Sequence, residues 1–156
     1  PAKLTGRDFA QGKAMFTATA CTACHRFNGE GIGIAPDISD AGRRYSVRDL
    51  LENIIEPSLV ISDQYGSEEF TMPEGNSIVG RVLGEEDGWI KVMTNPFAPD
   101  EAMGVEIAKI IERKPYPVSM MPPGLINALN PDELKDLLAY ILSGGNPADP
   151  MFAPQP

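Results

Sequence analysis

Two cysteines and a histidine form the most chemically specific pattern in this sequence. Cys21 and Cys24 lie three positions apart, and His25 directly follows the second cysteine. Covalent attachment of haem requires this C-x-x-C-H spacing, because each thiol closes a thioether to a vinyl group and the adjacent imidazole reaches the iron. The pattern therefore predicts one covalently bound haem c, with its iron held by His25.

Two other kinds of site also use a C-x-x-C pair. A thioredoxin-like redox pair should lie in a β-α-β context, and a zinc site needs two further soft ligands. The chain has only 2 cysteines and 1 histidine in 156 residues. This ligand count favours haem over zinc.

Methionine is the leading candidate for the sixth iron ligand, because the single histidine is already used. Of the 7 methionines, Met72 and Met121 share a Met-Pro context. A ligand must be held on a rigid loop, and the proline pair after Met121 supplies that rigidity, whereas Met72 is expected near a hairpin tip. We therefore favour Met121 over Met72 and over its neighbour Met120.

A glycine-rich segment follows the histidine, and its composition excludes a helix or a central strand. It is free to wrap the haem edge. Pro36, within it, can offer only its carbonyl, to which the second ring nitrogen of an iron-bound His25 would donate. Arg43 and Arg44 come next, and either could pair with a haem propionate through its planar guanidinium. A solvated surface charge is an equally good interpretation of each arginine.

The apolar periodicity predicts three helices. The first begins near Thr5 and Asp8 and ends before Cys21, the second is capped by Ser46, and the last is capped by Asn130. A glycine on the apolar face of the first helix suggests a close helix crossing there, because a side chain would hold the two backbones apart.

The amino-acid composition of the sequence changes between residues 60 and 118. Runs of β-branched and aromatic residues alternate there with turn clusters rich in proline and glycine, which predicts an inserted antiparallel sheet of three or four strands. Residues 104–107 could be its last strand or part of a short helix at 105–111. Trp89 is expected to anchor the core of the sheet. The proline-rich residues 146–156 are expected to be a tail or linker.

The charge balance limits the kinds of partner. The chain has 13 basic and 22 acidic residues, a net charge of −9, which argues against nucleic acid and anionic membranes and favours a partner with a basic surface. No apolar run approaches the roughly 20 residues that span a membrane. Because haem attachment accompanies export, we expect a periplasmic or otherwise exported protein whose signal or upstream domain is missing from this chain.

Taken together, these features resemble class I cytochromes c. The sequence is also similar to a haem-binding domain family of large planctomycete and verrucomicrobial proteins, in which a β insertion precedes a Ser-x-Met-Pro-x-Gly-Leu segment, here residues 119–125. The resemblance implies one domain over 1–156, mainly α with the class I fold and α+β overall because of the insertion. It further implies that Gly12 and Phe16 pack against Tyr140, that Pro36 accepts from His25, and that Met121 binds iron.

The leading functional hypothesis is single-electron transfer by a His/Met haem, with no substrate turnover in this domain. The partner would be a separate redox protein or a fused dehydrogenase, or a respiratory chain, and the β insertion could serve as the docking module. The alternative is a haem-based gas sensor or a peroxidase-like site with a displaceable methionine. Peroxide cleavage is disfavoured because no distal histidine is available.

Overall fold

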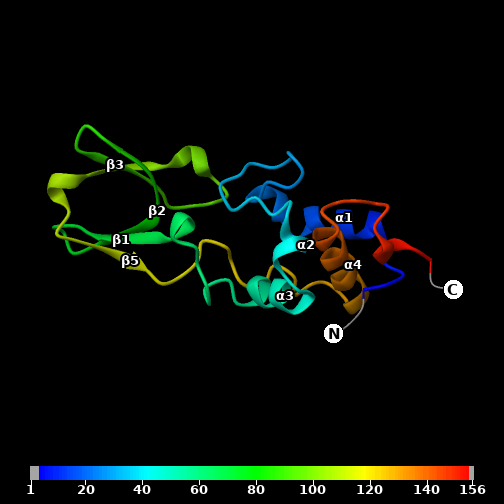
Figure 1. Ribbon diagram of the computed structural model, residues 1–156. Helices are drawn as coiled ribbons and strands as arrows, with labels where there is room; N and C mark the ends of the chain where they lie inside the picture. The colour runs from blue at the N-terminus through cyan, green and yellow to red at the C-terminus, as the bar shows by residue number, and fades with distance from the viewer. Residues whose placement is uncertain (1–3, 155–156) are drawn as a thin grey trace. The chain divides into compact units, whose positions relative to one another are not determined.

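The computed structural model describes residues 4–154, and they form two compact units (Figure 1). One unit contains the chain up to Glu56 and again from Pro123 onward; we call it the helical unit. The other is Pro57–Pro122, the β unit. The chain therefore leaves the helical unit once, builds the β unit, and returns.

The described part of the helical unit contains four α-helices, joined by long loops: α1 (Phe9–Ala18), α2 (Ala41–Arg44), α3 (Val47–Ile55) and α4 (Pro131–Leu142). Ser46 and Asn130 cap α3 and α4, as the sequence predicts, and each cap is part of a capping box. The start of α1 differs from the expectation, because Asp8 rather than Thr5 is its cap and accepts a hydrogen bond from the Gln11 backbone. The short helix α2 was not predicted.

Helices α1 and α4 cross in close contact (Figure 1). A Cβ built at Gly12 would lie 2.3 Å from the carbonyl oxygen of Asp136, so only glycine fits at this crossing. One turn on, the rings of Phe16 and Tyr140 pack with centroids 5.6 Å apart. The packing of Gly12 and Phe16 against Tyr140 is as the resemblance implies.

The segment after α4 is not a free tail, and that expectation was wrong as far as residue 154. The Phe152 ring packs edge-on against Phe9 of α1, with centroids 5.2 Å apart, and the Met151 carbonyl accepts from the Arg7 backbone at 2.9 Å. Proline-rich sequence lacks helical periodicity, but its isolated apolar side chains can still pack. Residues 155–156 lie outside the described part.

The β unit is a five-stranded antiparallel sheet in the order β4-β3-β2-β1-β5. The strands are β1 (Ser67–Thr71), β2 (Ser77–Glu86), β3 (Trp89–Met93), β4 (Met103–Glu106) and β5 (Glu112–Tyr116). The prediction of three or four strands was therefore too low by at least one strand. Strand β5 escaped notice because it is charged and contains Pro115, which is tolerated at the edge of a sheet.

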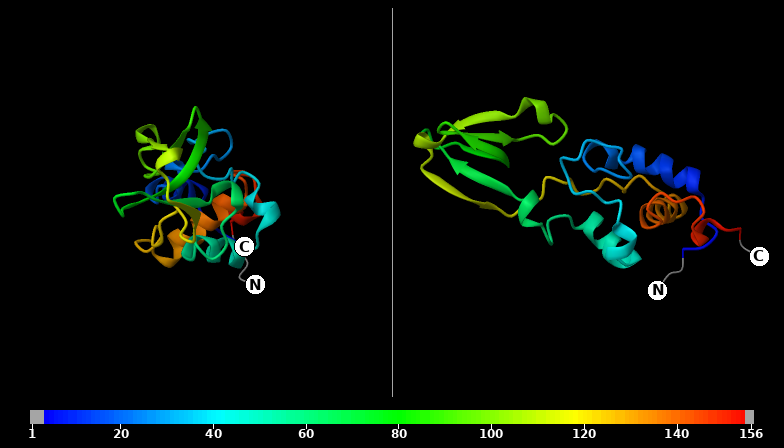
Figure 2. Two further views of the ribbon diagram at one scale, coloured as in Figure 1. Left: turned by 90° about the vertical axis from the view of Figure 1, so that its left-hand side faces the viewer. Right: turned by 45° about the horizontal axis from the view of Figure 1, so that its top comes forward.

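Strand β2 pairs with two different strands along its length. Its first half pairs with β1 and its second half, which carries a register shift between Val82 and Gly84, pairs with β3. Gly80 lies at the change of partner, where a Cβ would meet the Met93 carbonyl oxygen at 2.4 Å. Figure 2 shows the resulting sheet as a curled rather than flat layer.

The core of the β unit is centred on Phe70, which is fully buried. Ile90, Val92 and Val105 complete it, together with Met72. Trp89 is not part of this core: 49% of it is exposed, so the expectation of a tryptophan anchor was wrong. The alternation along β3 gives the inward face to Ile90 and Val92, and the outward face to Trp89.

Candidate haem site

The C-x-x-C-H residues lie on one tight turn directly after α1. Ala20 has a left-handed backbone (φ 60°), which turns the chain out of the helix into a single 3₁₀ turn, Cys21–Ala23. The backbone N–H of His25 then donates to the Cys21 carbonyl at 2.9 Å. Both thiols and the imidazole are therefore positioned by the same short stretch of backbone.

Both thiols are free and partly exposed. Burial raises the pKa of Cys21, against a weaker lowering effect of the Thr19 hydroxyl, and burial also raises the pKa of Cys24. Neither cysteine therefore has the low thiol pKa of a catalytic thiolate, which disfavours a redox-active pair. Two protonated, accessible thiols suit thioether formation.

The imidazole of His25 is fixed by a hydrogen bond to Pro36. The Nδ1···O distance is 2.7 Å, and because the carbonyl can only accept, Nδ1 carries the proton. Nε2 is then left with its lone pair free for a metal. Burial lowers the pKa of His25, and the hydrogen bond to Pro36 opposes this effect less strongly. The ring is consequently neutral at pH 7.

The Pro36 carbonyl is held in place by backbone hydrogen bonds on both sides. The N–H of Ala35 donates to the Cys24 carbonyl at 2.9 Å, and the N–H of Ile38 donates to the Arg26 carbonyl at 3.0 Å. The loop is thus in fixed register with the residues that flank the histidine.

Sequence reasoning missed a second set of contacts, which ties this loop to the turn that follows α4. The Asn28 side chain donates to the Gly144 carbonyl at 2.5 Å, and its backbone N–H donates to the Ser39 hydroxyl at 2.8 Å. The Ser39 hydroxyl in turn donates to the Asp37 carboxylate at 2.6 Å. An Asn-Gly pair signals a left-handed residue, and Asn28 has φ 51°, but its distant partner is not evident from the sequence.

We expect Asn28→Gly to raise the reduction potential of the haem-loaded protein by roughly 30–60 mV. The variant keeps the positive φ but loses the side-chain bond to Gly144, worth about 1 kcal/mol. A looser loop weakens the bond from His25 to Pro36, so the imidazole becomes less basic and stabilises ferric iron less. Voltammetry measures the potential, and NMR follows the exchange rate of the His25 Nδ1 proton.

A matched control is Asn53→Ala. The Asn53 side chain also donates to a backbone carbonyl, that of Asp49 at 2.7 Å, but it lies on α3, and its bond stays within that helix. Its removal should leave both the potential and the proton exchange unchanged. Equal shifts in the two variants would contradict a specific role of Asn28.

The structure does not test the predicted pairing of the two candidate arginines with haem propionates. Arg43 and Arg44 lie in the last turn of α2 and are exposed, and the guanidinium of Arg44 stands 5.4 Å from the centre of the Tyr45 ring. Within residues 4–154, neither guanidinium lies within ion-pair distance of a carboxylate. Their pairing with propionates stays a prediction.

The candidate methionines lie in the β unit, apart in sequence from the histidine. Met72 is buried in the core of that unit, where it packs with Phe70 and Val92. Met121 is half-buried, and its backbone N–H donates to the Ser119 hydroxyl at 3.1 Å. The Ser119 N–H donates in turn to the Ser58 hydroxyl at 3.0 Å. The core role of Met72 favours Met121 as the ligand.

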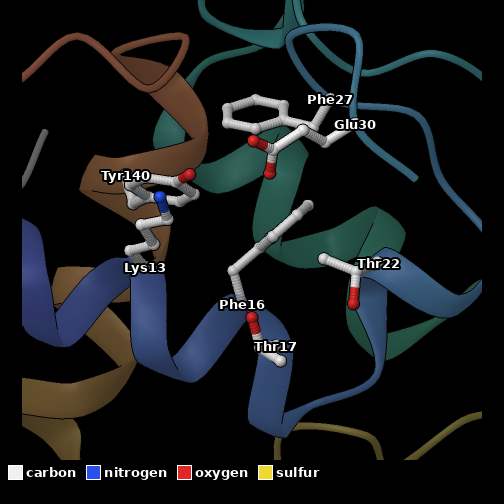
Figure 3. Close-up of a pocket in the computed structure, with 7 residues that line it drawn as sticks. All are labelled: Lys13, Phe16, Thr17, Thr22, Phe27, Glu30 and Tyr140. Atoms are coloured by element: carbon white, nitrogen blue, oxygen red, sulfur yellow. The ribbon is translucent and has the colours of Figure 1, made fainter.

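A small hollow lies next to the C-x-x-C-H turn (Figure 3). Phe16, Phe27 and Tyr140 form its apolar wall, with Phe16–Phe27 centroids 5.0 Å apart. Lys13, Thr17, Thr22 and Glu30 complete the lining. The two thiols and the imidazole lie outside this lining, so the hollow reflects the helix crossing rather than a haem pocket.

The donor set suits haem c and no other metal site. Two free thiols and an imidazole with an available Nε2 are the groups that haem attachment uses. Within the described residues, no cluster of three or more histidine, cysteine or acidic side chains is arranged to hold a metal ion. The same part of the chain contains no helix of the length and apolarity needed to cross a bilayer.

Comparison with known proteins agrees with the chemistry of this turn. The family model described as Cytochrome c matches residues 9–89, more than half of the 156 residues. No curated protein matches the sequence significantly.

Proposed function

Because the chain belongs to the cytochrome c family, we propose that it transfers single electrons through one covalent haem c with His25 and Met121 as axial ligands. The family establishes haem-based electron transport and an electron-carrier domain. The hydrogen bond from His25 to Pro36 is the observation that supports His25 as the axial ligand on the proximal side. It leaves Nε2 as the only imidazole atom able to bind iron.

Each residue of the site has a separate task in this proposal. Cys21 and Cys24 hold the group by thioethers, and His25, oriented by Pro36, binds the iron from one side. Bound there, haem iron supplies a one-electron couple. A thioether from Met121 is a weak donor that favours the ferrous state and keeps other ligands away from the metal. Arg43 and Arg44 offer guanidinium groups to the propionates.

The finer assignments follow from the same reasoning. We infer that the protein resembles the planctomycete and verrucomicrobial haem-binding domains in its inserted β unit, and that it works in the periplasm or another exported location. Its partner is a redox protein or a fused dehydrogenase with a basic docking surface. The net charge of −9 supports that choice of partner.

Covalent attachment is tested by acid–organic extraction of the denatured protein. Haem should stay with the wild-type polypeptide, because two thioethers survive loss of the fold. The double variant Cys21→Ala, Cys24→Ala should release its haem completely or bind none, while the retained His25 keeps the axial donor. Recovery of free haem from the intact wild-type chain would exclude the attachment.

A further inference from the structure

The β unit has an exposed tryptophan, a side chain that is usually buried or in contact with a partner. Trp89 is the one tryptophan of the chain, and 49% of its surface is open to solvent although it begins a central strand of the sheet. Its indole lies over Gly104 of β4, where a Cβ would stand 3.3 Å from the ring atom Cε3. The ring is thus supported on one face by the sheet.

Two carboxylates flank this ring. Glu86 of β2 and Glu106 of β4 are the direct cross-strand partners of Trp89, so all three side chains leave the sheet on the same face. Glu106 pairs with Lys109 at 2.7 Å, but both groups are accessible and such a pair is weak. Glu86 forms no ion pair within residues 4–154.

The charge of the chain is concentrated in the same unit. Residues 57–122 contain 11 acidic and 5 basic side chains, a net charge of −6, against 11 acidic and 8 basic, net −3, in the rest of the chain. An aromatic ring that lies between carboxylates attracts a cation in two ways. The quadrupole of the ring contributes one attraction, and the negative charges of the carboxylates contribute the other. Anions and anionic membranes are repelled by the same unit.

We propose that Trp89, Glu86 and Glu106 form a docking site for an arginine or lysine side chain on the basic surface of a protein partner. The proposal rests on the proposed function only in that an electron carrier must meet another protein. Arginine fits better than lysine, because its planar guanidinium stacks on an indole while its N–H groups reach a carboxylate.

The probe is a hexa-arginine peptide, titrated into the haem-loaded full chain. The single indole N–H signal in NMR reports on Trp89 alone, and it should move as the peptide binds. Calorimetry, which does not depend on the indole signal, measures the affinity of the variants: Trp89→Ala should weaken peptide binding about fivefold, and Glu86→Gln with Glu106→Gln about tenfold, at low salt. A hexa-lysine peptide should bind more weakly than hexa-arginine.

Matched variants separate the site from general acidity. Phe97 is an exposed aromatic of the same unit (54% exposed), and Asp100 and Glu101 are exposed carboxylates nearby in sequence. Phe97→Ala, and the pair Asp100→Asn with Glu101→Gln, should change the peptide affinity less than twofold. An indole signal that stays fixed at peptide saturation, or equal losses in the matched variants, would overturn the site.

A third result would assign the surface to another occupant. If the indole signal moves without peptide when Arg43 and Arg44 are both changed to alanine, the chain's own helical unit covers Trp89, and the proposal fails. The optical spectrum of the same samples reports on the haem ligands independently. A Met121→Ala variant that loses its methionine signature but keeps its peptide affinity would leave the docking site standing while it tests the ligand.

Discussion

Met121→Ala should abolish the weak charge-transfer band near the red edge of the ferric spectrum. That band arises from a thioether bound to ferric iron, and alanine offers no donor. We expect the reduction potential to fall on the order of 0.2 V, a fraction of the range of about 0.8 V that axial ligands span. The emptied position should also bind added cyanide or imidazole. Optical titration and voltammetry measure the three effects.

The controls for this prediction follow from where the other methionines lie. Met120 is adjacent and also half-buried, so Met120→Ala tests whether a loop shift can supply the sulfur. Met72 is buried in the β core, where truncation to alanine would cost about 2–5 kcal/mol, so Met72→Leu is the better variant because it conserves volume. Both variants should keep the band and the potential. Loss of the band in Met72→Leu alone would refute Met121 as the ligand.

The chemistry of the site could be predicted from the sequence because it is local. Cys21, Cys24 and His25 lie on one turn, and the caps at Ser46 and Asn130 act within four residues. Local hydrogen bonding leaves a direct trace in residue type and spacing. For the same reason the two capped helices were correctly placed.

The features that sequence reasoning missed depend on distant contacts. Asn28 bonds to Gly144, 116 positions away, and nothing in either neighbourhood identifies the other. Strand β5 owes its place to pairing with β1, against the charged composition of its own sequence. Trp89 was expected in the core of the sheet because large aromatic side chains usually bury much of their surface. The side chains of β3 alternate between the two faces of the sheet, however, and it is Ile90 that points into the core. Such choices are made by tertiary packing rather than by propensity.

Gly12→Ala should destabilise the helical unit severely, by about 3 kcal/mol or more. The added Cβ would lie 2.3 Å from the Asp136 carbonyl oxygen and 2.8 Å from the Tyr140 Cβ. Backbone atoms of a packed helix cannot yield as the end of a flexible side chain can, so α1 and α4 must move apart. Their separation would also loosen Phe16 from Tyr140 and release the turn that carries the cysteines.

The natural comparison is Gly84→Ala, because both glycines lie inside regular elements with ordinary backbone angles. A Cβ at Gly84 meets nothing within 4 Å. The free energy of unfolding of this variant should therefore lie within about 0.5 kcal/mol of the wild-type value. Chemical denaturation followed by helical circular dichroism measures both variants, and haem incorporation during expression gives a second readout. If Gly12→Ala proves as stable as Gly84→Ala, then the two helices do not cross as closely as described, and the support that α4 gives to the haem turn would have to come from elsewhere.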